Sequence, residues 1–389
     1  MSGDNTRAAP KIFLVAAEES GDRLGAGLIK VLRERLGVAA TFSGVGGSHM
    51  AEQGLTSLFP TDELSIIGLV AIPRRLPMIF RRIRETTEAV LAAKPDALVI
   101  IDSPDFTHRV ARRVRARDPS IPIVDYVSPT VWVWRPGRAR KMRGYVDSLL
   151  AVLPFEVDVH RKLGGPPCRY VGHPLLDDLG ALRPNSEERA RRSAQPPLLL
   201  VLPGSRRSEI KRNMAIFGET LRLLREQSVA FEPVLPTVPH LVESVRAAAA
   251  AWPVQPRIVV GEADKKAAFR SARAALAKSG TVTLELALAG VPMVTAYRVT
   301  EFEAFIARRV IQTSSIILAN LILGENVIPE FLQQDFKAEN LAPALRDVLA
   351  DTPMRQRQVD AFARLEQIMS TGGKRPSELA ADGVIAAMR

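Results

Sequence analysis

The feature that most constrains the fold is an alternation of short apolar runs with stretches of helical spacing. In the first half, the runs 11–17, 40–42, 97–101, 121–126 and 148–153 predict strands, and 24–36 and 107–116 predict helices. Strand, helix and strand joined by short connections are typical of a parallel α/β sheet.

The alternation stops at 182–197, a stretch rich in Arg, Glu, Ser and Pro that predicts an interdomain linker, which can include a short helix. It restarts with strands at 198–202, 234–235, 258–260, 274–277 and 293–297, and with helices at 282–288, 341–349 and 354–369. We therefore predict two facing, doubly wound, Rossmann-like α/β domains, which bind ligands beyond the carboxyl ends of their strands.

Composition supports a globular chain of more than one domain. The 389 residues exceed the usual ~100–200 per domain. Cys168, the single cysteine, excludes an internal disulfide and fits a reducing cytoplasm. No apolar run reaches the ~18–20 residues of a spanning helix, and 12–17 is too short for a signal peptide. We expect a cytoplasmic protein that is soluble or attached to a surface.

The charge is strongly positive, with a net +11 from 53 Lys+Arg and 42 Asp+Glu. Such an excess favours an anionic partner, although general solubility explains it too. In residues 64–84, apolar side chains alternate with arginines, as on a protein that lies on an anionic bilayer; a core helix with a solvated basic face is the alternative. Pro73 and Pro77 predict that this stretch is not one long helix. Nucleic acid is not expected, because aromatic residues make up only 5%.

Polar residues follow two strands of the first half. Glu18, Ser20, Gly21 and Asp22 come after 11–17, and Asp102 comes directly after 97–101. A carboxylate at the end of a strand, held by a Pro-containing turn, suits general-base chemistry. Helix N-capping explains both segments equally simply.

Two loops in the second half suit a diphosphate. Gly204, Ser205 and Arg206 follow the strand 198–202, and Ser279, Gly280 and Thr281 open a helix that carries Glu285. Backbone amides and Arg bind phosphate, and Glu285 could accept hydrogen bonds from ribose. P-loop spacing is missing, and a plain strand-to-helix turn is the alternative.

No metal site is predicted. The five histidines are scattered, lack metal-ligand spacing and are interpreted as hydrogen-bonded structural residues. No convincing Ser-His-Asp set is found either.

An ordered set of segments resembles the lipid-A-disaccharide synthase family. The segments are 20–28 (SGDRLGAGL), 101–106 (IDSPDF), 126–135 (YVSPTVWVWR), 153–156 (LPFE), 170–174 (YVGHP), 202–206 (LPGSR), 279–281 with Glu285, 296–298, and Asn320-Leu321 with Pro329, Glu330 and Gln333. Each is weak alone, but together they cover about 11–341, and the tryptophan segment is the most specific.

The resemblance implies an inverting glycosyltransferase of GT-B architecture. It implies transfer from UDP-2,3-diacylglucosamine to 2,3-diacylglucosamine 1-phosphate (lipid X), which gives the β-1,6 lipid A disaccharide 1-phosphate and UDP. It also implies no cofactor and no metal, and a peripheral position on the anionic inner face of the cytoplasmic membrane. Its domains would be 1–180 for the acceptor and membrane, 181–353 for the UDP-sugar, and 354–389 as helices that can cross back to the first domain.

The resemblance also assigns residues. Asp102 is the base, with Glu18 as its alternate or partner, and the acceptor cleft has Ser20, Gly21 and Asp22. The UDP-sugar is bound by Gly204, Ser205, Arg206, Ser279, Gly280, Thr281, Glu285, Asn320 and Gln333. The membrane or acyl chains contact Ile66, Ile67, Leu69, Val70, Ile72, Arg74, Arg75, Met78, Phe80, Arg81 and Arg82.

Departures from the family pattern and other functions stay open. Glu19, Thr130, Val133 and Glu325 stand where the family usually has other residues. Another UDP-sugar enzyme, such as a peptidoglycan glycosyltransferase or a UDP-N-acetylglucosamine epimerase, is one alternative. A membrane-surface adaptor that binds nucleotide without turnover is another. Oligomeric state and acyl-chain length are not predicted.

Overall fold

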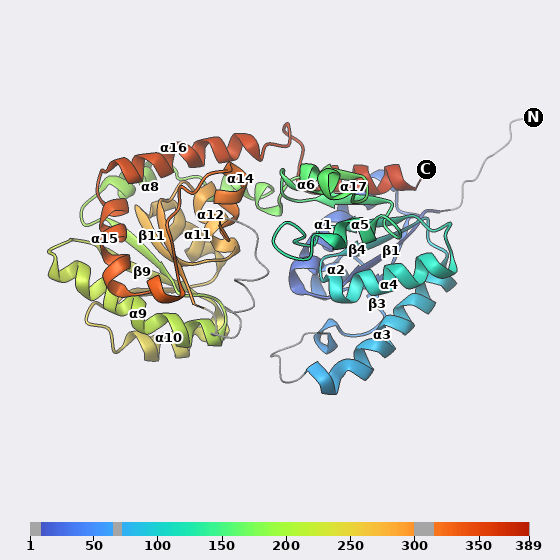
Figure 1. Ribbon diagram of the computed structural model, residues 1–389, viewed down its shortest axis with the longest axis horizontal. Helices are drawn as coiled ribbons and strands as arrows, with labels where there is room; N and C mark the ends of the chain where they lie inside the picture. The colour runs from blue at the N-terminus through green and yellow to red at the C-terminus, as the bar shows by residue number, and fades with distance from the viewer. Residues whose placement is uncertain (1–8, 65–71, 299–314, 389) are drawn as a thin grey trace, which may run out of the picture. The chain divides into compact units, whose positions relative to one another are not determined.

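The computed structural model describes residues 9–64, 72–298 and 315–388. They form two compact units, each built on its own parallel sheet (Figure 1). Unit 1 comprises residues 1–177 and 371–389, and unit 2 comprises residues 178–370. The predicted class, α/β with two parallel sheets, is confirmed.

In the described part of unit 1, seven strands lie in the order β3-β2-β1-β4-β5-β6-β7, and every pair is parallel. The strands are β1 (Lys11–Ala16), β2 (Thr41–Val45), β3 (Thr56–Ser57), β4 (Ala97–Ile101), β5 (Ile123–Tyr126), β6 (Ser148–Ala151) and β7 (Cys168–Tyr170). The helices are α1 (Glu19–Leu36), α2 (Ser48–Glu52), α3 (Ile72–Ala93), α4 (Pro104–Arg117), α5 (Gly137–Met142), α6 (Glu156–Leu163) and α17 (Pro376–Ala387).

In the described part of unit 2, six strands lie in the order β10-β9-β8-β11-β12-β13, again all parallel. The strands are β8 (Leu198–Leu202), β9 (Glu232–Thr237), β10 (Arg257–Val260), β11 (Ala274–Lys278), β12 (Met293–Tyr297) and β13 (Glu330–Leu332). The helices are α7 (Leu179–Leu182), α8 (Ser186–Ser193), α9 (Arg207–Glu226), α10 (Val242–Ala249), α11 (Glu262–Ser271), α12 (Thr281–Leu288), α14 (Leu318–Leu323), α15 (Ala338–Leu349) and α16 (Pro353–Ile368).

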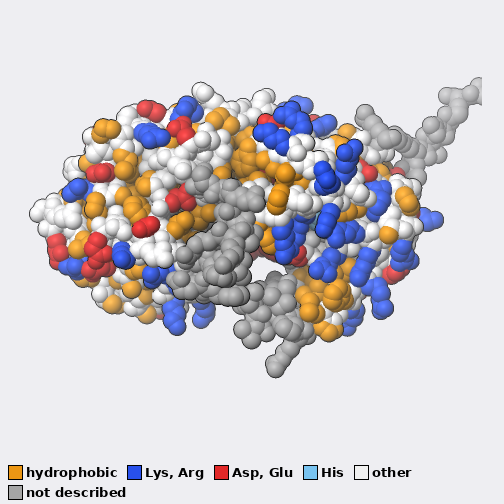
Figure 2. Space-filling model, in the orientation of Figure 1, with side chains coloured by type: hydrophobic (Ala, Val, Ile, Leu, Met, Phe, Trp, Pro, Cys, Tyr) orange, Lys and Arg blue, Asp and Glu red, His pale blue; other side chains and the backbone are white. Residues whose placement is uncertain are grey.

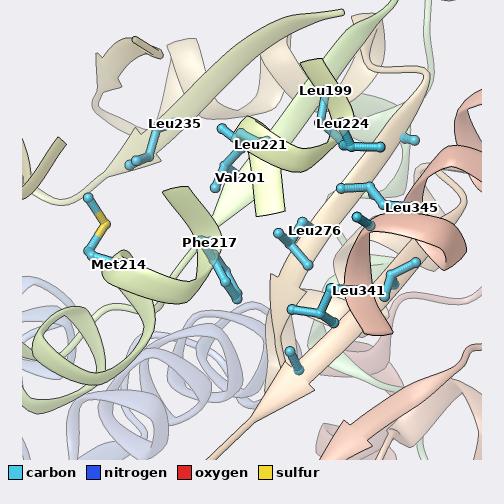
Figure 3. Close-up of a cluster of buried hydrophobic side chains, with 14 of the residues drawn as sticks. Leu199, Val201, Met214, Phe217, Leu221, Leu224, Leu235, Leu276, Leu341 and Leu345 are labelled. Atoms are coloured by element: carbon cyan, nitrogen blue, oxygen red, sulfur yellow. The ribbon is translucent and has the colours of Figure 1, made fainter. Parts of the chain in front are cut away.

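The central strands are continuous apolar runs because helices cover both faces of each sheet. All five residues of β4 are fully buried, and so are all but the first of β1. In unit 2, Phe217 and Leu221 of α9 and Leu341 and Leu345 of α15 converge on Leu276 of β11 (Figure 3). Truncating such a side chain to Ala typically costs about 2–5 kcal/mol.

The sequence predicts that two prolines break a helix in 64–84, and in the described part of that stretch, 72–84, they do not. α3 runs through both Pro73 and Pro77 as one helix of 22 residues. Pro73 lies in the first turn, where the amide needs no helical partner, and Pro77 lies only one turn further on.

The predicted linker, 182–197, is a packed part of unit 2. Asn185 and Glu188 form a capping box at the start of α8. Arg192 donates hydrogen bonds to the carbonyls of Phe269, Arg270 and Ala289 at 2.7–3.2 Å. The last helices divide between the units, because α16 belongs to unit 2 whereas α17 packs on α1 and on strands β4–β6 of unit 1.

Candidate active-site residues

Asp102 lies at the carboxyl end of β4, and its carboxylate is positioned from two sides. Ser20 Oγ donates to Asp102 Oδ2 at 3.0 Å, and the Ser103 amide donates to Oδ1 at 2.8 Å. Asp102 and Ser103 both have left-handed backbone, with φ of 53° and 45°. Two consecutive non-glycine residues in this region are strained, a feature that clusters at functional sites.

Ser20 reaches Asp102 because α1 begins close to the end of β4. A Cβ on Gly21 would lie 3.2 Å from the Ile101 carbonyl oxygen, so the small residue permits this approach. Glu18 is exposed immediately before α1, and Glu19 forms an exposed ion pair with Arg23 at 2.7 Å.

Asp22, also predicted for the acceptor cleft, has a different set of partners. Its buried carboxylate accepts hydrogen bonds from the amides of Gly47, His49 and Met50 at 2.7–3.1 Å. It therefore fixes the turn between β2 and α2, and its oxygens are engaged there.

A buried carboxylate lies on the strand next to β4. Asp125 of β5 is 1% exposed, and its Oδ2 lies 3.2 Å from His108 Nε2. His108 Nδ1 is 2.9 Å from the Tyr145 hydroxyl. Burial raises the pKa of Asp125, while His108 opposes the shift and the charge of Asp102 adds to it.

The tryptophan segment was part of the family resemblance but was not predicted as a site. Trp132 Nε1 donates to Glu156 Oε1 at 3.2 Å, and the Trp132 ring meets Phe155 edge to face at 5.2 Å. The Leu153 amide donates to Glu156 Oε2 at 3.0 Å. Burial raises the pKa of Glu156 to about 7, although these hydrogen bonds act to lower it. Glu156 thus anchors the segment.

Two further histidines, His160 and His173, have hydrogen-bond partners inside unit 1. His160 is fully buried with Nε2 2.8 Å from Ser128 Oγ, and burial lowers its pKa to about 4. His173 Nδ1 accepts from the Leu175 amide, and burial lowers its pKa to about 4 as well. Across 9–64, 72–298 and 315–388, no three His, Cys, Asp or Glu side chains gather as metal ligands would.

Unit 2 has a cavity of about 640 Å³ at the carboxyl ends of β8, β9 and β11. Six of the nine residues predicted for the UDP-sugar line it: Gly204, Ser205, Arg206, Gly280, Thr281 and Glu285. Ser279 is buried between β11 and Gly280. The Thr237 hydroxyl, also in the wall, is buried without a hydrogen-bond partner among the described residues.

Lysines that the sequence analysis did not assign face this cavity. Lys278 Nζ lies 3.0 Å from Glu209 Oε1 and 4.5 Å from the centroid of the Tyr297 ring. Lys265 Nζ lies 2.7 Å from Glu285 Oε2. Lys278 is the last residue of strand β11 and Lys265 lies on helix α11, so the fold brings both side chains to the cavity. No local sequence motif identifies Lys265 as a site residue.

Glu209 shapes the loop after β8. Its Oε2 accepts from the Ser205 amide at 3.0 Å, and a Cβ on Gly204 (φ 128°) would lie 2.4 Å from that oxygen. Arg206 is 3.7 Å from Glu209 Oε1 while its side chain is 79% exposed. The cavity thus combines two lysines, one extendable arginine and the start of α12 with carboxylates, which suits a nucleoside diphosphate.

Asn320 and Gln333 are not among the residues that line this cavity. Asn320 is buried, donates to the Ile328 carbonyl at 3.0 Å and accepts from the Val327 and Ile328 amides at 3.1 and 3.0 Å. Gln333 follows β13 with left-handed backbone (φ 49°). Glu325 pairs with Arg364 and Arg357 of α16, and Arg364 is the larger cause of its lowered pKa.

The predicted membrane stretch is described only in part. Ile66, Ile67, Leu69 and Val70, and the side chains of Ile72, Arg74 and Arg75, lie outside the described residues. Met78 is half-buried, Phe80 is 43% exposed and Arg81 is exposed. Arg82 is held by Glu63 and Glu85 at 2.7 and 2.6 Å.

A groove of about 810 Å³ runs between α3 and α4. Its wall combines apolar residues with four arginines: Pro77, Phe80, Arg81, Arg84, Thr87, Glu88, Arg113, Ala116 and Arg117. Arg117 pairs with Glu88 and is the first cause of the lowered pKa of that carboxyl. No described helix is both long enough and apolar enough to cross a bilayer.

Comparison with known sequences gives one consistent result. A family model described as lipid-A-disaccharide synthetase matches residues 12–384. A lipid-A-disaccharide synthase of Nitrobacter hamburgensis is 66% identical over 386 residues, which are 99% of this chain and 98% of the relative. One from Bradyrhizobium diazoefficiens is 67% identical over 379 residues, 97% of each chain.

Solved structures share the fold at low identity. A UDP-GlcNAc 2-epimerase from Neisseria meningitidis, bound to UDP-GlcNAc, matches with a TM-score of 0.64 and 11% identity over 97% of this chain and 100% of that one. MurG of Acinetobacter baumannii matches with a TM-score of 0.60 and 15% identity over 97% and 99%. These likenesses show a GT-B-like fold, shared by glycosyltransferases and epimerases.

Proposed function

The chain belongs to the lipid-A-disaccharide synthase family, and from this premise we propose its reaction, its site residues and its place at a membrane. It is an enzyme, a glycosyltransferase of lipid A biosynthesis. The proposed reaction joins UDP-2,3-diacylglucosamine to 2,3-diacylglucosamine 1-phosphate, with inversion at the anomeric carbon. The products are the β-1,6 disaccharide 1-phosphate and UDP.

Asp102 is the proposed general base, and its positioning after β4 is the observation that carries this assignment. The 6-hydroxyl of the acceptor attacks the anomeric carbon, its proton passes to Asp102, and the bond from that carbon to the UDP oxygen breaks. The Ser20 hydroxyl and the Ser103 amide orient the carboxylate by donating to it. A positioned base of this kind contributes about 10²–10⁴-fold to the rate. Glu18 is the alternate base.

The unit 2 cavity is the proposed UDP site. Lys278, Arg206 and the amides at Gly280 and Thr281 would neutralise the charge that develops on the leaving diphosphate. Glu285 would accept hydrogen bonds from the ribose after exchanging its contact with Lys265. Because these cations are protein groups, we expect the reaction to need no metal.

Both substrates carry acyl chains, so we propose that the protein works at the inner face of the cytoplasmic membrane. The groove between α3 and α4 supports this proposal, because it places exposed Phe80 among arginines. Apolar groups that enter the acyl boundary and arginines that contact anionic headgroups are the usual features of surface binding. Arg82, held by two glutamates, has an internal role instead.

A single-turnover assay in EDTA tests the reaction and the base together. Detergent-dispersed donor and acceptor are mixed with wild type, Asp102→Asn, Glu18→Gln, or the control Asp360→Asn at an exposed position of α16. We expect wild type and control to release UDP and disaccharide, and Asp102→Asn to be slower by about 10²–10⁴-fold. Full activity of Asp102→Asn would move the base to Glu18, and absence of disaccharide from wild type, even with added metal, would refute the reaction.

A further inference from the structure

We propose that Trp134, Arg135 and Arg138 bind the phosphate-bearing end of the acceptor. The ligand class is a hexose 1-phosphate, whose ring lies on the indole and whose phosphate is bound by the two guanidinium groups. The inference rests on the proposed function, because it assigns the acceptor end that lies away from the reacting hydroxyl.

The segment that carries these residues is rigidly held. Trp132 is anchored by Glu156 and Phe155, and the amides of Val133 and Trp134 donate to the Thr130 carbonyl at 3.0 and 3.2 Å. Trp134 Nε1 donates to Thr130 Oγ1 at 3.2 Å. Trp134 is nevertheless exposed, so the fold fixes an aromatic surface at the solvent boundary. A surface ordered before binding loses little conformational entropy when a ligand arrives.

Two guanidinium groups adjoin the indole. Arg135 Cζ lies 4.2 Å from the Trp134 ring centroid and Arg138 Cζ lies 5.9 Å from it. Arg135 is exposed and has no ion-pair partner in the described part of the chain. A guanidinium next to an aromatic ring keeps its N–H edge available, and that edge matches two phosphate oxygens.

One contact connects this cluster to α4, the helix that follows the proposed base. Arg138 Nη2 lies 3.3 Å from Asp105 Oδ1, and Asp105 is in the first turn of α4, three residues after Asp102. The base and the arginines thus belong to neighbouring loops of unit 1. In a hexose 1-phosphate, the carbon that carries the phosphate and the carbon that carries the CH2OH group are both bonded to the ring oxygen, so a base and a phosphate site on neighbouring loops can contact the same acceptor.

The surrounding surface is positive. α5 and the residue after it carry Arg138, Arg140, Lys141 and Arg143, and Figure 2 shows Lys and Arg side chains gathered where Figure 1 places α4 and α5. Asp105 is the carboxylate that faces the cluster, and its side chain is 82% exposed. Such a field attracts an anionic substrate.

The test compares short-chain, water-soluble acceptors with and without the 1-phosphate. Arg135→Gln and Arg138→Gln are measured beside Arg143→Gln, which makes the same charge change at the end of α5. We expect the two variants to raise KM for the phosphorylated acceptor roughly 10- to 100-fold, as loss of a charged hydrogen bond does. Their kcat, their KM for the UDP-sugar and their use of the unphosphorylated acceptor should match those of Arg143→Gln.

Several results would overturn the subsite. Equal losses with both acceptors would mean that the arginines do not bind the phosphate. Loss of binding to anionic vesicles, with an unchanged KM for the soluble acceptor, would assign them to lipid headgroups. If wild type forms no disaccharide, the proposed function fails, and calorimetry with glucosamine 1-phosphate decides on the subsite alone. Binding by wild type and not by Arg135→Gln would support it, and equal binding would refute it.

Discussion

Glu156 is a buried carboxylate that makes the hydrogen bonding of the tryptophan segment sensitive to pH. It is 2% exposed, and its two oxygens accept from Trp132 and Leu153. Burial favours the neutral acid more strongly than the hydrogen bonds favour the ion, so its pKa rises from 4.5 to about 7. The neutral acid can offer fewer acceptor lone pairs to the same two donors.

The shift predicts a pH-dependent stability of unit 1. Between pH 4.5 and about 7 the folded protein holds a proton on Glu156 that the unfolded chain has released. The contribution of Glu156 to the free energy of unfolding should therefore fall as pH rises through this window, by about 3 kcal/mol in total. Urea unfolding at pH 5–8 should show a shallower dependence in Glu156→Gln, whereas the exposed control Glu52→Gln should follow wild type.

Some site residues could be predicted from chain position and others could not. Ser20 and Asp102 follow strands that the βαβ pattern makes neighbours, and β1 does pair with β4. The partners of Asp22 and Asn320 are backbone amides of other loops, 25–28 and 7–8 residues away. A sequence motif identifies a side chain but not the turn whose amides that side chain will bind. The structural roles of Asp22 and Asn320 could therefore not be predicted from the motifs.

The main errors in the predicted helices and strands involve prolines. α3 accommodates two prolines near its start, and β9 runs over Glu232–Thr237 although only 234–235 was predicted. Pro233 and Pro236 each remove one ladder hydrogen bond, yet both are buried, and β9 is paired on both sides. The packing of neighbouring chains outweighs the lost bonds, which local propensity does not reveal.

The last helix makes close contact with the first sheet, and this gives a stability prediction. A Cβ on Gly383 of α17 would lie 2.5 Å from Leu150 Cδ2, and Leu150 of β6 is fully buried. Gly383→Val should destabilise unit 1 by about 1–3 kcal/mol through overpacking. Denaturant unfolding would be followed by tryptophan fluorescence in a Trp252→Phe background, so that only Trp132 and Trp134 of unit 1 contribute. Ala386→Val, at an exposed position of the same helix, should unfold at the same denaturant concentration as wild type. If Gly383→Val and Ala386→Val lowered the unfolding midpoint equally, the close contact of Gly383 with Leu150 would be contradicted.

At the scale of the whole molecule, the net charge of +11 predicts salt-dependent binding to anionic vesicles. Arg84→Gln and Arg113→Gln, in the groove between α3 and α4, should each weaken binding by about 1 kcal/mol, or roughly fivefold. Sedimentation with anionic and zwitterionic vesicles at low and high salt measures this. Arg246→Gln on α10 is the control for the loss of one positive charge. If it weakened vesicle binding as much as Arg84→Gln does, total charge and not the groove would be responsible for binding.

The discontinuity of unit 1 has a consequence for biosynthesis. Unit 2 is one continuous segment, whereas unit 1 needs α17, which follows all of unit 2 in the chain. Ribosomes release the chain from its N-terminus at about 5–20 residues per second. The second unit can therefore finish folding while the first still exposes the surface of β5 and β6 that α17 will cover. We expect chaperones to bind a nascent chain that has stalled before residue 371, because its unit 1 still lacks α17.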